Sequence, residues 1–282
     1  MLNESRLFSF LDDNHGYSIH FLEGQKIIHD LAIIHGTPGQ GFLFYRDIVL
    51  SVMQLTAFMK SMEGFGIYID SETPHFRLKI EANESGRFRT LLLPTNFNES
   101  PQVLSGKVRV SKTFGKDSRP YTSILELKET DCSEIMNKVL KESYQIDGRI
   151  YLSPSSDQSV FIMKLPDLNQ NKVTKEDRLN ISEFWNSKKA DIEKIWEKAL
   201  NEEKSIIDEF TNLNMQYLSS KQIEFKCSCS RERMIDVLKG LANETPDSLF
   251  PDQKNSLEIK CDYCQTFYEI LKNEVFPGIL KQ

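Results

Sequence analysis

The sequence predicts an α+β protein: an N-terminal, mostly antiparallel sheet domain with helices, a helical linker and a small C-terminal zinc-binding module. Three observations predict it. Short strand-like runs follow one another through residues 1–171, a charged segment without glycine or proline fills residues 172–221, and two close cysteine pairs lie in residues 222–282. Strands joined by short turns favour antiparallel pairing, and 282 residues leave room for two unequal domains.

In the N-terminal domain, the apolar pattern changes from helical to alternating spacing. Residues 41–60 place Ile48, Val52 and Met59 at helical intervals, which predicts a buried helix. Alternating runs then predict strands, and the sequence from Asn83 to Gly86 predicts a hairpin turn. The expected strands are residues 66–70, 75–81, 88–93, 106–111, 121–127, 149–152 and 160–165, with a short helix at 132–143.

The linker has the pattern of two amphipathic helices. Asn180 and Glu183 have the spacing of a capping box at a helix start. We expect one apolar face to pack on the sheet domain. A charged segment held by one face could also detach and expose apolar surface while staying soluble. The candidate residues of that surface are Phe184, Trp185, Ile192, Ile195, Trp196 and Leu200.

Two thiol pairs mark the C-terminal module. One residue separates Cys227 from Cys229, and two separate Cys261 from Cys264. Each pair can supply two thiolates from one turn, so the four predict a tetrahedral site for one zinc ion per chain. Such close sulfurs can also oxidise to each other, which indicates a metal site that doubles as a thiol switch. Cys132 has no ligand-like neighbour, and we expect it to be a spare cysteine.

The rest of the module is expected to have only a small apolar core. The pattern predicts a helix over residues 231–241 and a hairpin of strands 257–260 and 266–271 that carries the second cysteine pair. The expected inward face of the helix comprises Met234, Val237, Leu238 and Leu241. About sixty residues bury little apolar area, so the module would depend on its metal. Structural zinc contributes about 10–16 kcal/mol in small finger peptides.

Charge and targeting signals indicate where the protein is located and which partners are excluded. The N-terminus shows no basic leader before an apolar core, and no stretch approaches the roughly 18 apolar residues of a membrane span. We therefore expect a cytoplasmic protein, in which structural disulfides are rare. A net charge of −6 and a pI near 5.5 argue against a nucleic-acid binder. Residues 221–282 carry nine Lys and Arg against ten Asp and Glu, so the module has no basic excess either.

The cysteine segment resembles a known family. The run from Ile223 to Arg233, followed by Cys261-Asp262-Tyr263-Cys264 and Tyr268, resembles the redox module of the heat shock protein 33 family of redox-regulated chaperones. The order of sheet domain, linker and terminal module is similar too, and Leu55-Thr56-Ala57 with Lys60 resembles part of the family's N-terminal domain.

Three positions depart from the family pattern. Ser71-Glu72-Thr73 stands where a glycine-rich turn usually precedes the proline, and Ser143-Tyr144-Gln145 replaces Ser-Glu-Gln. Gln265 follows the last cysteine, where a glycine is common. A non-glycine residue in a left-handed turn costs roughly 1–2 kcal/mol, so we expect a less stable or reshaped knuckle there.

The resemblance implies an ATP-independent holdase, not an enzyme, that binds unfolding client proteins under oxidative stress. The reduced, zinc-bound protein would be an inactive monomer. Oxidation would form the disulfides Cys227–Cys229 and Cys261–Cys264, release zinc, give a homodimer and expose the linker candidates to clients. Neither nucleic acid nor a membrane is an implied partner. The glycine-rich residues 36–41 lack the Lys-Ser/Thr ending of a phosphate loop, so no nucleotide site is expected.

Two other classes remain open from the residues alone. A thiol-disulfide oxidoreductase would carry its Cys-x-x-Cys at a helix N-terminus after a strand, whereas Cys261 and Cys264 are expected between two strands. A constitutive zinc-ribbon interaction module would keep its metal and ignore peroxide. All five histidines lie between His15 and His75, and no nucleophile motif stands out, so no catalytic residue is assigned.

Overall fold

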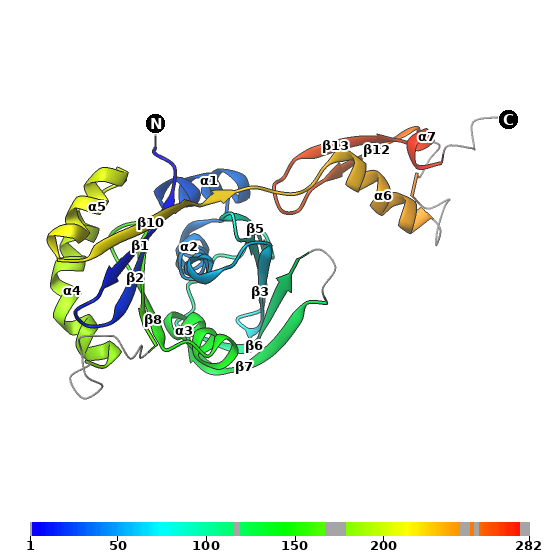
Figure 1. Ribbon diagram of the computed structural model, residues 1–282. Coiled ribbons are helices and arrows are strands. Elements are labelled where there is room, and N and C mark those ends of the chain that lie inside the picture. Colours follow the sequence, from blue (N-terminus) through cyan, green and yellow to red (C-terminus); the bar gives the residue numbers. More distant parts are fainter. Residues whose placement is uncertain (1, 116–118, 167–178, 243–248, 251–253, 277–282) are drawn as a thin grey trace. The chain divides into compact units, whose positions relative to one another are not determined.

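The computed structural model describes residues 2–115, 119–166, 179–242, 249–250 and 254–276. The chain forms two compact units, Met1–Phe225 and Lys226–Gln282, each with its own apolar core (Figure 1). The expected α+β class with mostly antiparallel sheets is confirmed. By compactness the second unit begins at Lys226, because Ile223 is buried in the first unit's core and Phe225 pairs with one of its strands.

One half of the first unit is a five-stranded antiparallel sheet in the order β10-β1-β2-β9-β8. Strands β8 and β9 confirm the two expected at residues 149–152 and 160–165. Strands β1 and β2 were not anticipated; every residue of β2 is buried, so it lacks the alternation that reveals a half-exposed strand. The bounds are β1 Arg6–Asp12, β2 Tyr17–Glu23, β8 Gly148–Leu152, β9 Gln158–Lys164 and β10 Gln216–Gln222.

The other half is a six-stranded sheet in the order β11-β5-β4-β3-β6-β7, antiparallel except for the pair β11–β5. It confirms the five strands expected between residues 66 and 127. The predicted hairpin turn is closed by Asn83, whose Oδ1 accepts from the N–H groups of Ser85 and Arg87. The bounds are β3 Glu63–Thr73, β4 Phe76–Asn83, β5 Arg87–Leu93, β6 Val103–Phe114, β7 Tyr121–Asp131 and β11 Glu224–Phe225.

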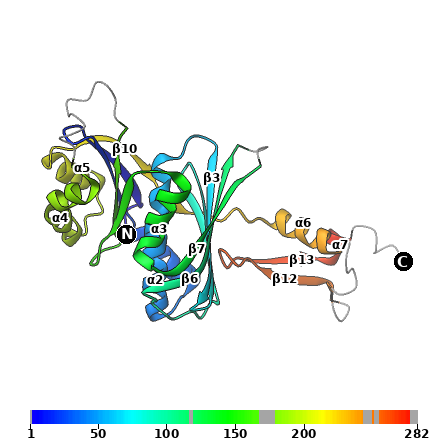
Figure 2. The same cartoon turned by 90° about the horizontal axis from the view of Figure 1, so that it is seen from below.

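A buried helix lies between the two sheets (Figures 1 and 2). It confirms the helix predicted at residues 41–60 and consists of α2 (Gly39–Met53) and the 3₁₀ turn η1 (Gln54–Phe58). By length and composition alone, Gly39–Phe58 could cross a membrane, because it has 20 residues and its most apolar 18-residue window has a mean hydropathy of 1.2. Its apolar window is 67% buried inside the protein, which fits a core helix.

Shorter helices complete this core. Helix α1 (Gln25–His35) follows β2 and was not anticipated, whereas the helix expected at residues 132–143 is present as three consecutive turns of different pitch. Those turns are η2 (Cys132–Glu134), α3 (Ile135–Val139) and the π-helical η3 (Leu140–Tyr144).

The two linker helices cover the other face of the five-stranded sheet (Figure 1). Helix α4 (Ile181–Lys198) begins at the predicted capping box of Asn180 and Glu183, and α5 (Glu203–Asn212) follows it. The linker was expected to be helical as far as residue 221, but its last part is a strand. After Asn214, which takes a left-handed φ of 61°, the chain reverses and forms β10 on the free edge of β1.

The second unit is a hairpin with a helix beside it. Helix α6 (Arg231–Ala242) and strands β12 (Ser256–Lys260) and β13 (Phe267–Leu271) match the predicted elements, and α7 (Lys272–Val275) follows. Of the helix positions expected to face inward, Leu238 is buried and Met234 packs against the core, but Val237 and Leu241 are 60% and 48% exposed. The buried core among the described residues is Leu238, Phe250, Ile270 and Val275.

Candidate metal centre

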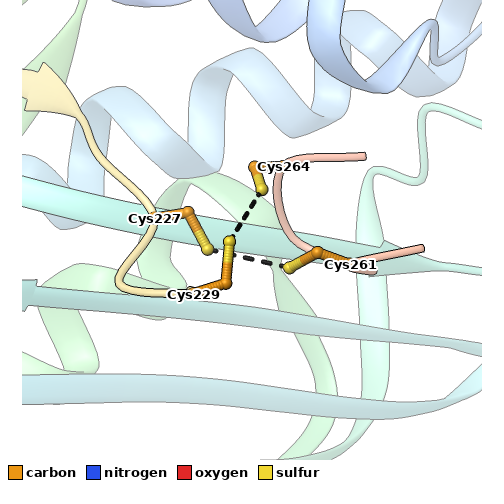
Figure 3. A group of neighbouring side chains, drawn as sticks. All are labelled: Cys227, Cys229, Cys261 and Cys264. Carbon is orange, nitrogen blue, oxygen red and sulfur yellow. Dashed lines mark hydrogen bonds between the residues drawn. The ribbon is translucent and has the colours of Figure 1, made fainter. Parts of the chain in front are cut away.

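Two loops bring the four predicted cysteine ligands together (Figure 3). Cys227 and Cys229 lie between β11 and α6, and Cys261 and Cys264 lie between β12 and β13. All four Sγ atoms lie within 4.8 Å of one another. Two contacts run between the pairs, 3.8 Å from Cys227 to Cys261 and 3.2 Å from Cys229 to Cys264.

This sulfur cluster fits zinc. Zn–S bonds of about 2.3 Å in tetrahedral geometry place sulfurs about 3.8 Å apart, close to the separations observed. The group of possible ligands contains no histidine and no carboxylate, only cysteines. Four thiolates in tetrahedral arrangement are typical of a closed, structural zinc site. Such an ion would be held by Cys227, Cys229, Cys261 and Cys264.

The second cysteine pair sits on a tight knuckle. The Cys261 N–H donates to the Thr266 carbonyl over 2.9 Å, and the Gln265 N–H donates to the Cys261 carbonyl over 2.8 Å. Gln265 takes a left-handed φ of 60°, the conformation for which glycine is usual. Its side-chain amide donates to the Asp262 carbonyl over 2.7 Å, which offsets part of the conformational cost.

The first cysteine pair is fixed by the start of α6. Ser230 Oγ accepts a hydrogen bond from the Arg233 N–H over 3.3 Å, as a helix N-cap does. Arg233 also donates to the Ser228 carbonyl, between the two cysteines, over 2.5 Å. Arg231 pairs with both carboxylate oxygens of Glu274 on α7, and that hydrogen bond lowers the pKa of Glu274 to about 2. The arginines of the motif therefore hold the cysteine loop in place.

Two hydroxyl groups approach the sulfurs. Tyr268 Oη lies 3.1 Å from Cys229 Sγ, and Thr266 Oγ1 lies 3.2 Å from Cys264 Sγ. Sequence reasoning included Tyr268 in the motif without giving it a role, and it missed Thr266. Their spacing from Cys264, two and four residues, is the signal that could have indicated them on an extended strand.

The thiols differ in how readily they ionise. Burial raises the pKa of Cys229 to about 12 and also raises that of Cys261. Burial acts in the same direction on Cys264, but hydrogen bonds from Thr266 and the neighbouring thiols outweigh it and lower its pKa to about 7. Four thiolates at these distances repel one another unless a cation is bound. The cluster therefore suits a metal that is bound as protons leave.

Cys132 lies apart from this cluster, in the first compact unit. Its half-buried side chain packs against the main core, and burial, helped by Asp131, raises its pKa to about 12. A thiol with so high a pKa is a poor nucleophile at neutral pH.

The linker candidates all face the five-stranded sheet. Phe184 stacks on Tyr17 with ring centroids 4.2 Å apart, and Trp185 stacks on Tyr151 at 3.8 Å. These contacts belong to one apolar cluster shared with β1, β2 and β9. Within it, Phe184, Ile192, Ile195 and Trp196 are buried, and Trp185 and Leu200 are partly buried.

The turn between α4 and α5 is held by side-chain amides that sequence reasoning missed. Gln25 donates to the Ala199 carbonyl and Gln158 to the Leu200 carbonyl, each over 2.8 Å. Asn3 donates to the Asn201 carbonyl over 3.1 Å. The donors come from three distant parts of the chain, so no local pattern points to them.

Fold and site define a class: an α+β protein whose separate C-terminal unit holds a four-cysteine candidate metal centre. A family model described as "Hsp33 protein" matches residues 5–271. The chain belongs to the Hsp33 family, which confirms the resemblance seen in the sequence.

Individual relatives agree with this assignment. A 33 kDa chaperonin of Clostridium beijerinckii is 38% identical over 66 residues, 23% of this chain and 22% of that protein. A 33 kDa chaperonin of Escherichia coli is 19% identical over 283 residues, 95% of this chain and 92% of the relative. The crystal structure of the 33 kDa chaperonin (heat shock protein 33 homolog) of Thermotoga maritima has a TM-score of 0.72 at 14% identity, covering 98% of this chain and 97% of that one. That likeness shows a shared fold, and the match with the Clostridium protein spans about a fifth of its length.

Proposed function

We propose that this chain is a redox-regulated, ATP-independent holdase chaperone that binds unfolding proteins under oxidative stress. Membership in the Hsp33 family supports the chaperone class. The observation that carries the regulation is the cluster of four Sγ atoms within 4.8 Å in a unit with a thin apolar core. A cluster that holds such a unit together in one redox state and not in the other is a switch.

In the reduced state, the four cysteines hold one zinc ion per chain. Cys227 and Cys229 on one loop and Cys261 and Cys264 on the other would hold the ion, which when bound would balance the thiolate charges and cross-link the two loops. The residues around it contribute the rest: Ser230 and Arg233 hold the first cysteine loop, and Gln265 closes the second knuckle. With the loops held, the second unit stays folded and the chaperone is inactive.

Oxidation by a peroxide opens the switch. In each pair the two thiolates lose two electrons and form one S–S bond, and the peroxide takes those electrons and two protons from the solvent as its O–O bond breaks to give water and an alcohol, or two waters from hydrogen peroxide. The products are the disulfides Cys227–Cys229 and Cys261–Cys264, which leave no thiolate ligands for zinc. Pairing within each loop is favoured once the metal leaves, because neighbours along the chain stay close after unfolding. Cys132 stays a free thiol.

Clients then bind apolar surface that the reduced protein covers. The helices α4 and α5 pack one face of the five-stranded sheet, and their release exposes both that face and their own apolar side. Phe184, Trp185, Ile192, Ile195, Trp196 and Leu200 are the proposed contacts on the helices. The division into a chaperone core, residues 1–171, a linker, 172–221, and a switch module, 222–282, follows these roles. The active form is a homodimer, the protein is cytoplasmic, and no catalytic activity, nucleic acid or membrane is involved.

One purified-protein experiment tests the proposal. Zinc content and suppression of thermal aggregation of a model client are measured before and after peroxide, without nucleotide. We expect one zinc and no suppression in the reduced protein, and zinc loss with suppression after oxidation. Suppression that is independent of peroxide would point to a constitutive zinc-ribbon module. Catalytic turnover of a dithiol substrate would point to an oxidoreductase.

The disulfide pairing has its own test. Peptide mapping of the oxidised protein should find each cysteine joined to its sequence neighbour. In the folded unit, close S···S contacts of 3.8 Å and 3.2 Å run between the pairs. Mainly crossed disulfides, such as Cys229 to Cys264, would therefore mean that oxidation occurs in the folded unit.

A further inference from the structure

Two hydroxyl groups, one on strand β13 and one immediately before it, each contact one sulfur of the cluster. Tyr268 lies on β13, and Thr266 immediately precedes that strand. Residues two apart in an extended segment share a face. Their hydroxyls reach different cysteine pairs, since Tyr268 contacts Cys229 at 3.1 Å and Thr266 contacts Cys264 at 3.2 Å. Each cysteine loop therefore has one hydroxyl at one of its sulfurs.

The position of Tyr268 is set by packing as well as by the strand. It pairs across the hairpin with Ile259 on β12, and its side chain packs against the buried cluster of this unit. The ring is therefore held independently of the hydroxyl, which lies at the sulfur. A phenol carries its proton at neutral pH, so toward a thiolate it can only donate.

We propose that Tyr268 is a positioning residue of the metal centre: its hydroxyl donates a hydrogen bond to Cys229 Sγ, tightens metal binding by the first cysteine loop and slows the oxidation of that loop. The inference rests on the proposed zinc-thiol switch and adds a residue that sets its threshold. Thr266 differs, because there Cys264 Sγ donates to Thr266 Oγ1 over 3.2 Å.

The physical reason is orientation together with charge. A donor to a ligand sulfur fixes where its lone pairs point, and loss of such an outer partner typically lowers metal affinity about 10–100-fold. The same hydrogen bond draws charge from the thiolate, and the thiolate is the form that attacks an oxidant. Removing the hydroxyl should therefore weaken zinc binding and speed oxidation of the Cys227–Cys229 pair.

Full-length reduced protein and three variants test this. Tyr268→Phe removes one hydroxyl and keeps the ring, Thr266→Val removes the other and keeps the shape, and Tyr217→Phe is the control in the first unit. Zinc affinity is measured by competition with a chromophoric chelator. Oxidation is followed by timed alkylation and mass spectrometry, which reports each cysteine pair separately. The cobalt-substituted proteins give a third measurement, because their thiolate-to-metal absorption responds to hydrogen bonding at sulfur.

We expect Tyr268→Phe to lower zinc affinity about 10-fold or more, to shift the cobalt absorption and to speed the loss of thiols at Cys227 and Cys229 first. Thr266→Val leaves the Tyr268 hydrogen bond in place, so it should leave the oxidation rate of Cys227 and Cys229 unchanged, and Tyr217→Phe should match the wild type in every measurement. Equal zinc affinity and equal oxidation rates in Tyr268→Phe and the wild type would overturn the inference and leave the switch itself intact. A wild-type protein that binds no zinc would overturn the switch as well.

A variant that keeps the hydroxyl guards against a folding defect. With 3-fluorotyrosine at position 268 the phenol is a stronger donor of nearly the same size. It should shift the cobalt absorption opposite to Tyr268→Phe and slow oxidation of the first pair. An effect in the same direction as Tyr268→Phe would mean that the ring packing matters and the hydroxyl does not.

Discussion

Glu23, at the end of β2, is unusual for an ionisable residue because it is only 1% exposed. One oxygen accepts a hydrogen bond from the Gln25 N–H over 2.9 Å, and the other has no hydrogen-bond partner among the described residues. Burial raises its pKa to about 7, the Gln25 bond opposes that rise, and the nearby charge of Asp157 adds to it. Asp157 is itself paired with Arg46 of α2 at 2.6 Å.

The first prediction is a pH-dependent stability of the first unit. A carboxyl whose folded pKa lies above its unfolded value of 4.5 binds more protons in the folded state, so it adds stability below pH 4.5 that is lost as pH rises toward 7. The expected loss is on the order of 3 kcal/mol. Glu23→Gln should flatten the profile in urea unfolding between pH 5 and pH 8, about the range of the shift, whereas exposed Glu72→Gln should not. A steep profile in both variants would assign the effect to another group.

Gln265 provides the second prediction. Its left-handed conformation costs roughly 1–2 kcal/mol, and its hydrogen bond to Asp262 returns about 0.5–1.5 kcal/mol. Gln265→Ala keeps the strain and loses the bond, so the zinc-bound second unit should become less stable by about 1 kcal/mol. Gln265→Gly loses both, so it should stay near the wild type. Unfolding of the second unit in denaturant gives the order of stability of the wild type and the two variants. An alanine variant as stable as the wild type would contradict the prediction.

At the scale of elements, the docking of α4 and α5 depends on a few aromatic contacts. Phe210 of α5 is fully buried and stacks on Phe10 of β1 at 4.4 Å. Both tryptophans of the chain lie on α4, where Trp185 stacks on Tyr151 of β8. Helices of this length are marginal in water by themselves, so docking supplies most of their order.

Phe210→Ala should therefore undock the helices in the reduced, zinc-bound protein. Truncating a buried phenylalanine costs about 3–5 kcal/mol, which is large compared with the free energy that docks one short helix. Tryptophan emission should move toward that of exposed indole, and hydrogen exchange should speed up across α4 and α5 but not across β3 and β4. Phe114→Ala, at a position 45% exposed, is the control. If the proposed function holds, the variant suppresses aggregation without peroxide, and undocking without suppression would place the client surface elsewhere.

The elements also separate what sequence can predict from what it cannot. The alternation in β4 and the capping box at Asn180 are local signals, and both elements lie where they were expected. Strand β2 is buried on both faces and β10 depends on the free edge of β1, so neither has a local pattern of its own. The spacing of the four cysteines in the sequence was enough to predict them as ligands. The contact of the Tyr268 hydroxyl with Cys229 could not be predicted in this way, because it depends on the register of β13 against β12.

At the scale of the whole molecule, the two compact units should respond differently to metal removal. The second unit buries few apolar side chains, and a structural zinc supplies about 10–16 kcal/mol in comparable peptides. A chelator under reducing conditions should abolish exchange protection in α6, β12 and β13 and leave that of β3 to β6. Calorimetry should show one transition lost and one kept. A metal-free, reduced protein with a protected second unit would contradict this.

Strand β10 has a consequence for how the protein is made. Arg6 of β1 pairs with Gln222 of β10, so one of the two strands that flank β1 is synthesised 216 residues later, the difference of the two numbers, whereas its other neighbour β2 follows at once. At roughly 5–20 residues per second, that interval is on the order of ten to forty seconds. Through most of it α4 and α5 are also missing, and Phe8, Phe10 and Phe21 have no helix to cover them.

The growing chain thus displays, on the ribosome, the apolar sheet face that the finished protein is proposed to offer its clients. Ribosome-bound chains arrested before Ile181 should cross-link to other holdases more strongly than chains arrested after Phe225. Equal cross-linking would mean that the face is covered some other way. A protein proposed to bind unfolding chains would then itself need a chaperone while it is being synthesised.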